Sequence, residues 1–433
     1  MIPRKGISHL RLFFISVVLL FSTSDVFPKP IFIYTSEPVI RVSLTENVKN
    51  LSLHTDGNFK LNYQGIEIAK VNNSDVSFSF SHDGTPVAAL ANQEIEFLSP
   101  IKIEQADSTV VAGTISAGAD GIKFNYQTYP GSMEIIPEND GTFRLVNFVP
   151  LEKYLRGVVP NELVNNLTPD ELQACMAQAI AARNFAFYKM SEEDSTEFDV
   201  YSDTRDQVYS GMEKYKSLAD SAIKLTSGTI VEYNGQPARC FFHSTCGGHT
   251  ENVQHIWQGQ PSLPYLTGVS DVDSTTGQPF CIYSPQFYWT STYTERELDK
   301  LLRANLGLAN PTYTGIKVKS NVSELKVLDR FDSFRVDTLE IKMENGEVYY
   351  VRGDRTRYLF KSTDGALLRS SLFRITTERN DDGNIKKVVI KGQGSGHGVG
   401  MCQWGALGMS RLGYSYLQIL SHYYPGTVVK KVY

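Results

Sequence analysis

The chain has 433 residues, of which 41% are hydrophobic and 21% are charged, and its formal net charge is -5. This composition is typical of a globular protein, and the length predicts two or three domains. Because binding to nucleic-acid phosphates requires a basic surface, the slightly acidic balance argues against nucleic acid as a partner.

The first residues have the pattern of an export signal. Arg4, Lys5 and Arg11 precede or open an apolar run from Leu12 to Phe21, and small polar residues follow. This order is typical of a secretory signal peptide, and the run is shorter than the about 20 residues that span a bilayer. We expect residues 1–24 to be a signal peptide, with an uncleaved N-terminal anchor as the alternative. The rest of the chain is then expected in the periplasm or cell envelope, with membrane contact only through an uncleaved signal.

Five cysteines follow, at Cys175, Cys240, Cys246, Cys281 and Cys402. An exported location permits disulfides, and an odd count leaves at least one thiol unpaired. We expect Cys246 to pair with Cys281 across a loop that contains Trp257. Cys175 lies in a helical pattern and is expected to be a buried small hydrophobic residue.

Residues 36–148 have the pattern of an all-β module. Runs that alternate apolar and polar residues occur at Ile40–Leu44, Phe59–Tyr63 and Val76–Phe80. Asp-Gly turns such as Asp83-Gly84 and Asp140-Gly141 separate such runs, which is typical of hairpins. Because this segment contains no cluster of titratable residues, we expect it to be a scaffold or a binding module.

A long helix is predicted after residue 149. It begins at Thr168, with Pro169 at its first position and Glu171 at the third, as in a capping box. Arg183 lies on the apolar stripe of this helix. Such an arginine either pairs with a carboxylate or carbonyl groups, because an unpaired buried charge is costly, or extends its charged end to the surface.

The remainder mixes strands and helices. Strands are predicted at Gly228–Tyr233, Arg239–His243 and Val336–Lys342, the last within a β-rich stretch over 315–395, and a helix at Glu295–Ala304. Two short helices broken by Gly413 are expected after the glycine-rich loop Gly392–Gly400. The fold class is therefore expected to be α+β.

Glu162 is the first candidate catalytic residue. It is a single acid that follows an apolar run, Gly157–Pro160. An acid in an apolar pocket has a raised pKa, which suits a general acid near neutral pH. By pattern alone, Glu162 could equally be a capping or solvated residue.

His243, Cys246 and His249 form a second candidate site. Their short spacing is typical of zinc ligands, and Cys246 with His249 could also form a nucleophilic pair. However, alternate strand residues face opposite sides, so the two histidines converge only if the Gly247-Gly248 turn folds back. A disulfide at Cys246 would exclude both chemistries.

The segment Gly394–Ala406 is the third candidate. Its dense glycines allow close approach of a ligand to the backbone, His397 lies among them, and Trp404 offers an apolar face for a sugar ring. The segment lacks the Gly-Lys-Ser/Thr ending of a phosphate-binding loop, so nucleotide binding is not expected.

Together these segments resemble the SpoIID/LytB family in order and approximate spacing. The matching pieces are Tyr154–Glu162, Gln178–Arg183, Gln207–Gly211, Ser244–Gly248, Pro264–Leu266, Gly396–Ala406 and His422–Thr427. Each motif is short, but their joint order is specific, and the resemblance covers residues 149–433. It implies that the β-rich N-terminal module over 36–148 is followed by a mixed α/β SpoIID-like domain over 149–433 with a β-rich insertion.

The resemblance implies a protein that acts on peptidoglycan. Enzymatic members of the family are lytic transglycosylases, and the family's catalytic glutamate falls on Glu162. Such an enzyme needs only one carboxylate, because the C6 hydroxyl of the muramic sugar acts as the nucleophile and leaves a 1,6-anhydro end. Other members are described as amidase enhancers, so the alternative is a non-catalytic peptidoglycan-binding protein whose partner is a cell-wall amidase. A third hypothesis is a zinc amidase that uses His243, His249 and His397.

The remaining motif residues are expected to position the glycan strand. They are Arg183, Gln207, Tyr209, Ser244, Thr245, His397 and Gln403. Some family members bind zinc in the stretch after the catalytic helix, but Phe198–Gly211 contains no cysteine or histidine here. We therefore predict no metal ligand and no cofactor.

Overall fold

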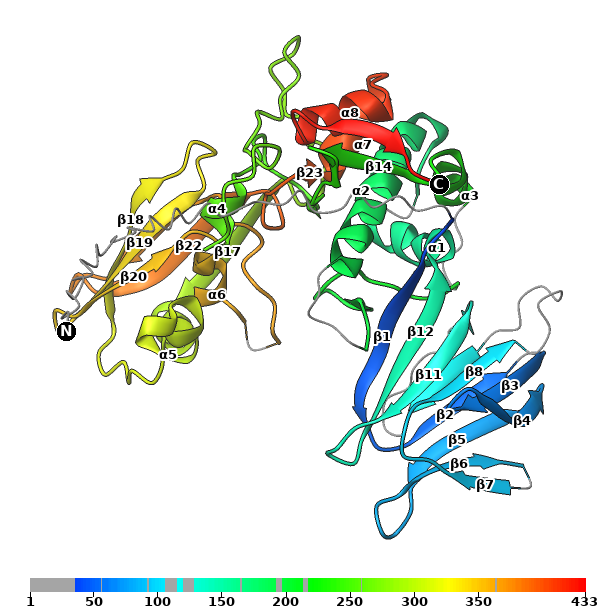
Figure 1. Cartoon of the computed structure of the whole chain (residues 1–433). Coiled ribbons are helices and arrows are strands. Elements are labelled where there is room, and N and C mark those ends of the chain that lie inside the picture. Colours follow the sequence, from blue (N-terminus) through cyan, green and yellow to red (C-terminus); the bar gives the residue numbers. More distant parts are fainter. Residues whose placement is uncertain are drawn as a thin grey trace, which may run out of the picture. The chain divides into compact units, whose positions relative to one another are not determined.

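The computed structural model describes residues 36–55, 57–91, 93–105, 115–119, 128–163, 166–191, 197–212, 217–257, 259–362 and 364–433 (Figure 1). It contains helices and several sheets, so the predicted α+β class is confirmed. The signal peptide predicted over residues 1–24 lies outside the described residues. In the described part of the chain, no helix is both long and apolar enough for a membrane span.

The N-terminal module consists of two sheets. The first has the order β13-β1-β12-β11-β8-β3-β4. Its strands are β1 (Val39–Val48), β3 (Asn58–Tyr63), β4 (Ile66–Asn72), β8 (Ile101–Gln105), β11 (Ser132–Pro137), β12 (Phe143–Pro150) and β13 (Val200–Tyr201). The second has the order β10-β9-β2-β5-β6-β7. Its strands are β2 (Leu51–Thr55), β5 (Asp75–Phe80), β6 (Pro86–Leu90), β7 (Gln93–Glu96), β9 (Ile115–Ala119) and β10 (Thr128–Tyr129). The alternating residues of strands such as β2, β3 and β5 thus lie in a shared core, in which Phe78, Phe97 and Phe143 are in ring contact.

The module continues directly into the helical part of the chain. Strand β12 ends at Pro150, and α1 (Leu151–Glu162) begins at the next residue (Figure 1). The buried side chains of the two sheets belong to the same hydrophobic core as those of α1, α2 (Leu172–Met190) and α3 (Ser217–Leu225). The expected boundary at residues 148/149 therefore lies within β12, two residues before the strand–helix junction, and one core extends on both sides of it.

Helix α1 is not evident in the sequence, because Pro160 lies within it and proline usually breaks a helix. Here the proline is close to the end of the helix, where Asn161 Nδ2 donates to the carbonyl oxygen of Gly157 at 2.6 Å. The capping box predicted at Thr168 is present: the Glu171 carboxylate accepts from the Thr168 backbone N–H at 2.6 Å. The capping residues form a short 3-10 turn, Pro169–Glu171, and the α-helix follows it.

The C-terminal elements surround α2. Strands β14 (Thr229–Tyr233), β15 (Gln236–Pro237) and β24 (Val428–Lys431) form one sheet, and β16 (Phe242–His243) pairs in parallel with β23 (Met401–Cys402). The helices are α4 (Val253–Ile256), α7 (Gln403–Arg411) and α8 (Tyr416–Tyr423). The break predicted between the last two is confirmed at Gly413, whose φ is 86°.

The β-rich insertion has its own hydrophobic core. Its sheets have the orders β17-β22-β21 and β18-β19-β20. The elements are β17 (Tyr288–Thr294), α5 (Glu295–Ala309), the 3-10 turn Pro311–Tyr313, β18 (Val322–Arg330), β19 (Val336–Met343), β20 (Val348–Arg352), α6 (Arg355–Leu359), β21 (Phe373–Arg379) and β22 (Ile385–Gln393). Helix α5 begins at the predicted residue, because Thr294 and Glu297 form a capping box.

A buried ion pair joins α1 to α2. Arg183 is fully buried and donates to both carboxylate oxygens of Glu152, at 2.8 and 2.7 Å, and to the carbonyl oxygen of Thr229 at 3.0 Å. The carboxylate expected from the sequence is therefore present, and the alternative of an arginine that reaches the surface is wrong. Burial alone would raise the pKa of Glu152, but the bonds from Arg183, Tyr433 and the Gly228 N–H together lower it.

Replacing Glu152 by glutamine should destabilise the fold strongly. The change leaves the Arg183 charge buried without a counter-ion, which costs about 3–5 kcal/mol. The free energy of unfolding in urea measures this loss. Because the pKa of Glu152 is lowered on folding, its contribution is complete above about pH 4.3, the usual value of a glutamate, and is lost as the pH falls through the lowered value.

Lys70→Gln is the matched control, because it removes an exposed ion pair with Glu67. That pair is worth less than about 1 kcal/mol. Equal losses in the two variants would contradict the structural importance of the Glu152–Arg183 pair.

Candidate active site

Glu162 is the last residue of α1 and is half-buried. Gln403 Nε2, at the start of α7, lies 3.4 Å from Glu162 Oε2, and the backbone N–H of Val208 also donates to this carboxylate. Burial raises the pKa of Glu162, and the two donors oppose this only in part. The site therefore contains an acid that keeps its proton to higher pH than a solvated glutamate does.

The Gln207–Gly211 motif supports the end of α1. Gln207 and Tyr209 are buried: Gln207 Oε1 accepts from Tyr154 at 3.1 Å, and Tyr209 donates to Asn147 at 3.0 Å. Their side chains thus contact residues of α1 and β12, while the backbone of Val208 between them contacts the Glu162 carboxylate. Both side chains, which the sequence predicts to bind substrate, are buried and hold α1 in place.

The Ser244-Thr245 motif lies beside the glycine-rich loop. Thr245 and Ser395 exchange two backbone hydrogen bonds, at 2.9 and 2.8 Å. The backbone N–H of Trp404 donates to the carbonyl oxygen of Ser244 at 3.0 Å. Thr245 is buried, with its hydroxyl 2.7 Å from that of Ser284, whereas Ser244 is half-buried. Ser244, His397 and Glu162 are therefore the predicted site side chains that remain partly accessible, and the buried Gln403 contacts the acid.

His397 is held by the backbone through both ring nitrogens. Its Nδ1 accepts from the Val399 N–H at 3.1 Å, and its Nε2 lies 3.0 Å from the carbonyl oxygen of Phe242, which assigns the proton to Nε2. Burial lowers the pKa of His397 to about 3, so the ring is neutral. The ring thus holds the glycine-rich loop against β16, and its expected role in substrate binding stays a prediction.

The histidine zinc site considered from sequence is not formed. His243 Nδ1 lies 3.2 Å from the Val399 carbonyl oxygen, and His249 Nδ1 lies 2.6 Å from that of Thr250, so these nitrogens donate to carbonyls. In the described part of the chain, the group of side chains able to hold a metal contains none of the three histidines.

Arg183 does not reach the substrate region. Its guanidinium is bound to Glu152 and Thr229, with no exposed surface. The sequence pattern indicated a buried arginine with a carboxylate partner, and the additional assignment to substrate binding does not agree with this burial.

Cys246 and Cys281 are neighbours, as expected, but they are not disulfide-bonded. Their Sγ atoms are 3.5 Å apart, whereas a disulfide requires about 2.05 Å. Cys402 and Asp271 complete this buried group. Neither was expected from the sequence, because Cys402 lies more than 100 residues after Cys281 and Asp271 belongs to no short cysteine or histidine motif; the odd cysteine was the available signal.

A cavity of about 1040 Å³ lies at the insertion. Its lining includes Trp289, Arg330, Arg374 and Lys391, together with Gly248 of the Ser244–Gly248 motif. Of the candidate residues named from the sequence, His249 lines it, whereas Glu162 and the residues expected to position the glycan do not.

Two family models match the sequence. The model described as "Stage II sporulation protein", SpoIID, matches residues 139–233, which include α1, α2 and Glu162. A domain model of unknown function matches residues 282–400, which is the β-rich insertion.

Curated relatives extend the similarity over most of the chain. An uncharacterized protein of Brachyspira hyodysenteriae is 29% identical over 92% of this chain and 94% of its own length. The amidase enhancer of Bacillus subtilis is 27% identical over 90% of this chain, which spans 63% of that relative. Stage II sporulation protein D of Bacillus subtilis is 28% identical over 76% of this chain and 86% of its own length.

Replacing Gln403 by leucine should raise the pKa of Glu162 further. The amide is a donor that favours the charged carboxylate, and leucine has similar size but no donor. A ¹³C NMR titration of the glutamate carboxyls measures the effect, with the Glu162 signal assigned by its absence in Glu162→Gln. The control is Gln278→Leu, an exposed glutamine. An unchanged or lower pKa would exclude Gln403 as a donor to the acid.

Proposed function

The chain belongs to the SpoIID/LytB family, and from this premise we propose that it is an exported peptidoglycan lytic transglycosylase with Glu162 as its single acid–base group. The coarser part of the proposal, a cell-wall-related role, follows from relatives named amidase enhancer and stage II sporulation protein D. The export and the glycan substrate follow from the N-terminal pattern and the family resemblance of the motifs.

The observation that carries the proposal is the raised pKa of Glu162 and its cause. Burial raises it, rather than repulsion from a second carboxylate. Ordinary glycosidases pair two carboxylates, one to protonate the leaving oxygen and one to activate water or attack the sugar. A site built around one buried acid suits an intramolecular nucleophile instead.

In the proposed reaction, Glu162 donates its proton to the glycosidic oxygen as the bond from that oxygen to C1 of the muramic sugar breaks. The C6 hydroxyl of the same sugar then bonds to C1 and gives its proton to the Glu162 carboxylate. The products are a free glycan end and a 1,6-anhydro end, and Glu162 is protonated again. No water is consumed.

The surrounding residues position this acid. The Gln403 amide and the Val208 N–H stabilise the carboxylate formed after the first proton transfer, because both donate to it. Holding the C6 hydroxyl close to C1 supplies a further rate gain by orientation. Ser244 and Trp404, joined by a backbone hydrogen bond, are two of the half-buried motif residues available to contact sugar.

The second candidate function is that of a non-catalytic amidase enhancer. It is favoured by the relative of that name, which is similar over 90% of this chain. In that case the same motifs would hold glycan without cleaving it, and a cell-wall amidase would be the partner.

Glu162→Gln should abolish cleavage while glycan binding is retained, because glutamine keeps the shape of the acid but has no proton to transfer. General acid–base catalysis contributes about 10²–10⁴-fold, so the rate should fall by at least about a hundredfold. The measurement is mass spectrometry of purified glycan strands, with and without stem peptides, for 1,6-anhydro ends.

The matched control is Glu344→Gln, an exposed glutamate in the insertion, which should cleave like the wild type. Anhydro ends from the wild type and control alone would establish the transglycosylase. Strand binding without anhydro ends from any of the three proteins would exclude it and favour the enhancer.

The cleavage rate should also decrease as the pH rises through the pKa of Glu162, because only the protonated acid can donate. Since burial raises this pKa, the alkaline decrease is expected at higher pH than for a solvated glutamate. In Gln403→Leu the decrease should move to still higher pH. A pH–rate profile tests both statements; a rate that increases through this range would require Glu162 to act first as a base.

A further inference from the structure

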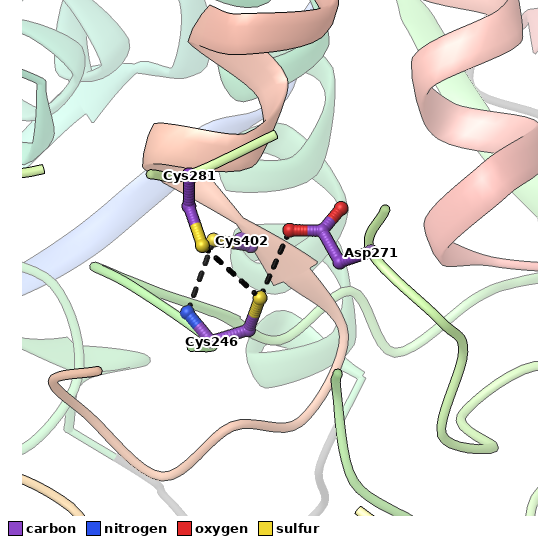
Figure 2. A group of neighbouring side chains, drawn as sticks. All are labelled: Cys246, Asp271, Cys281 and Cys402. Atoms are coloured by element: carbon purple, nitrogen blue, oxygen red, sulfur yellow. Dashed lines mark hydrogen bonds between the residues drawn. The ribbon is translucent and has the colours of Figure 1, made fainter. Parts of the chain in front are cut away.

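Three thiols and one carboxylate converge in the interior of the C-terminal part of the chain. Figure 2 shows the four side chains directed toward one another from separate segments. We propose that this cysteine cluster, made of Cys246, Asp271, Cys281 and Cys402, is a structural zinc site. The proposal replaces the expectation from sequence that the chain has no metal ligand, and it is independent of the proposed cleavage reaction.

The spacing of the four ligand atoms suits a tetrahedral ion. All of them lie within 4.8 Å of one another. Cys246 Sγ is 3.5 Å from Cys281 Sγ and 2.9 Å from Asp271 Oδ2. Zinc bonds of about 2.3 Å to sulfur and about 2.0 Å to oxygen place ligand atoms about 3.5–3.8 Å apart, so small side-chain shifts are sufficient.

Backbone donors already point at the sulfurs. Cys402 Sγ accepts from the N–H groups of Cys246 and Gly405, and Cys246 Sγ accepts from that of Gly248, each at 3.2 Å. Cys402 is also the N-cap of α7, where the helix terminus favours a negative charge. These donors stabilise thiolates, the form in which cysteine binds a metal.

The carboxylate is oriented from outside the cluster. Tyr423 donates to Asp271 Oδ1 at 2.6 Å, which leaves Oδ2 directed at the sulfurs. A side chain at Gly405 would clash here, because a Cβ atom would lie 2.1 Å from the Tyr423 hydroxyl and 2.5 Å from Asp271 Oδ2. A hydrogen bond from outside the cluster to a ligand, like that from Tyr423 to Asp271, is typical of metal sites.

A buried positive charge lies beside the cluster. Arg335 is fully buried and donates to the carbonyl oxygens of Cys246 and His249, both at 2.8 Å. Among the described residues, it makes no ion pair with a carboxylate within 4.0 Å. The buried carboxylates of Glu251 and Asp354 interact with this charge at longer range, and a zinc–thiolate group of net negative charge would add to the compensation.

A disulfide accounts for less of this geometry. It would use two sulfurs and leave the third thiol and the buried carboxylate without a role, whereas a zinc ion uses all four groups. Zinc also suits three soft sulfur ligands and is redox-inactive. Cys240 is equally buried but lies outside the cluster, so burial of cysteine alone does not explain the convergence.

The site would be structural, because four protein ligands leave no open position for substrate or water. Cys246 follows the Ser244-Thr245 motif, and Cys402 precedes Gln403, which reaches Glu162. Bound zinc would therefore hold these two segments together next to the acid without taking part in the chemistry.

The first test is the metal content of the full chain, purified without chelator and under reducing conditions. Native mass spectrometry and elemental analysis should find one zinc per chain. After removal of zinc, titration with Co²⁺ should give the near-ultraviolet absorption of cobalt–thiolate bonds, and returning Zn²⁺ should raise Tm by about 5 °C or more.

Variants identify the ligands. Cys402→Ser and Cys281→Ser should each weaken zinc binding by more than about tenfold and reduce the cobalt absorption, whereas Cys240→Ser should bind like the wild type. The wild-type measurement decides the question if a ligand variant does not fold. A wild-type chain that binds neither ion with its thiols reduced would overturn the proposal. So would a chain that is lighter by two hydrogen atoms, with Cys246 joined to Cys281.

Discussion

The position of the acid depends on one buried ion pair. Glu152 and Glu162 are at opposite ends of α1, so whatever fixes Glu152 also fixes the direction of the helix that carries the acid. Glu152 binds Arg183 of α2, the N–H of Gly228 before β14, and the hydroxyl of the C-terminal Tyr433. A single carboxylate thus connects four segments that are far apart in sequence. Arg183 of the Gln178–Arg183 motif is needed for this connection, and its guanidinium is fully buried there.

Two opposing effects set the chemistry of Glu162. Burial favours the protonated form, which can donate, whereas the Gln403 amide and the Val208 N–H favour the carboxylate, which must accept a proton in the next step. An acid–base group has to serve in both forms, so an environment that favoured only one would slow one of the two steps. The partial cancellation of burial by two donors is the arrangement that such a group requires.

The sequence predicted the local features of the fold well and the long-range ones less well. Capping at Thr168 and the start of α5 at Glu295 follow from residues three positions apart, and the alternation in Val336–Lys342 follows from one face of a strand. The motifs that meet at Glu162 were identified by resemblance. Their surroundings were not, because Tyr209 and His397 are held by contacts with residues more than 60 positions away.

The cysteine cluster also depends on contacts between distant parts of the sequence, and it adjoins a segment that contacts Glu162. Two of its cysteines adjoin motif residues, Cys246 after Thr245 and Cys402 before Gln403. The segments that carry them are joined by the pairing of β16 with β23. This parallel pair has two residues in each strand, too few to be stable alone, because isolated strand pairs are marginal even when longer. Something further must hold the two segments in register. Backbone donation from Cys246 to the sulfur of Cys402 supplies part of this restraint, and an ion shared by both sulfurs would strengthen it, one residue away from the amide that contacts Glu162.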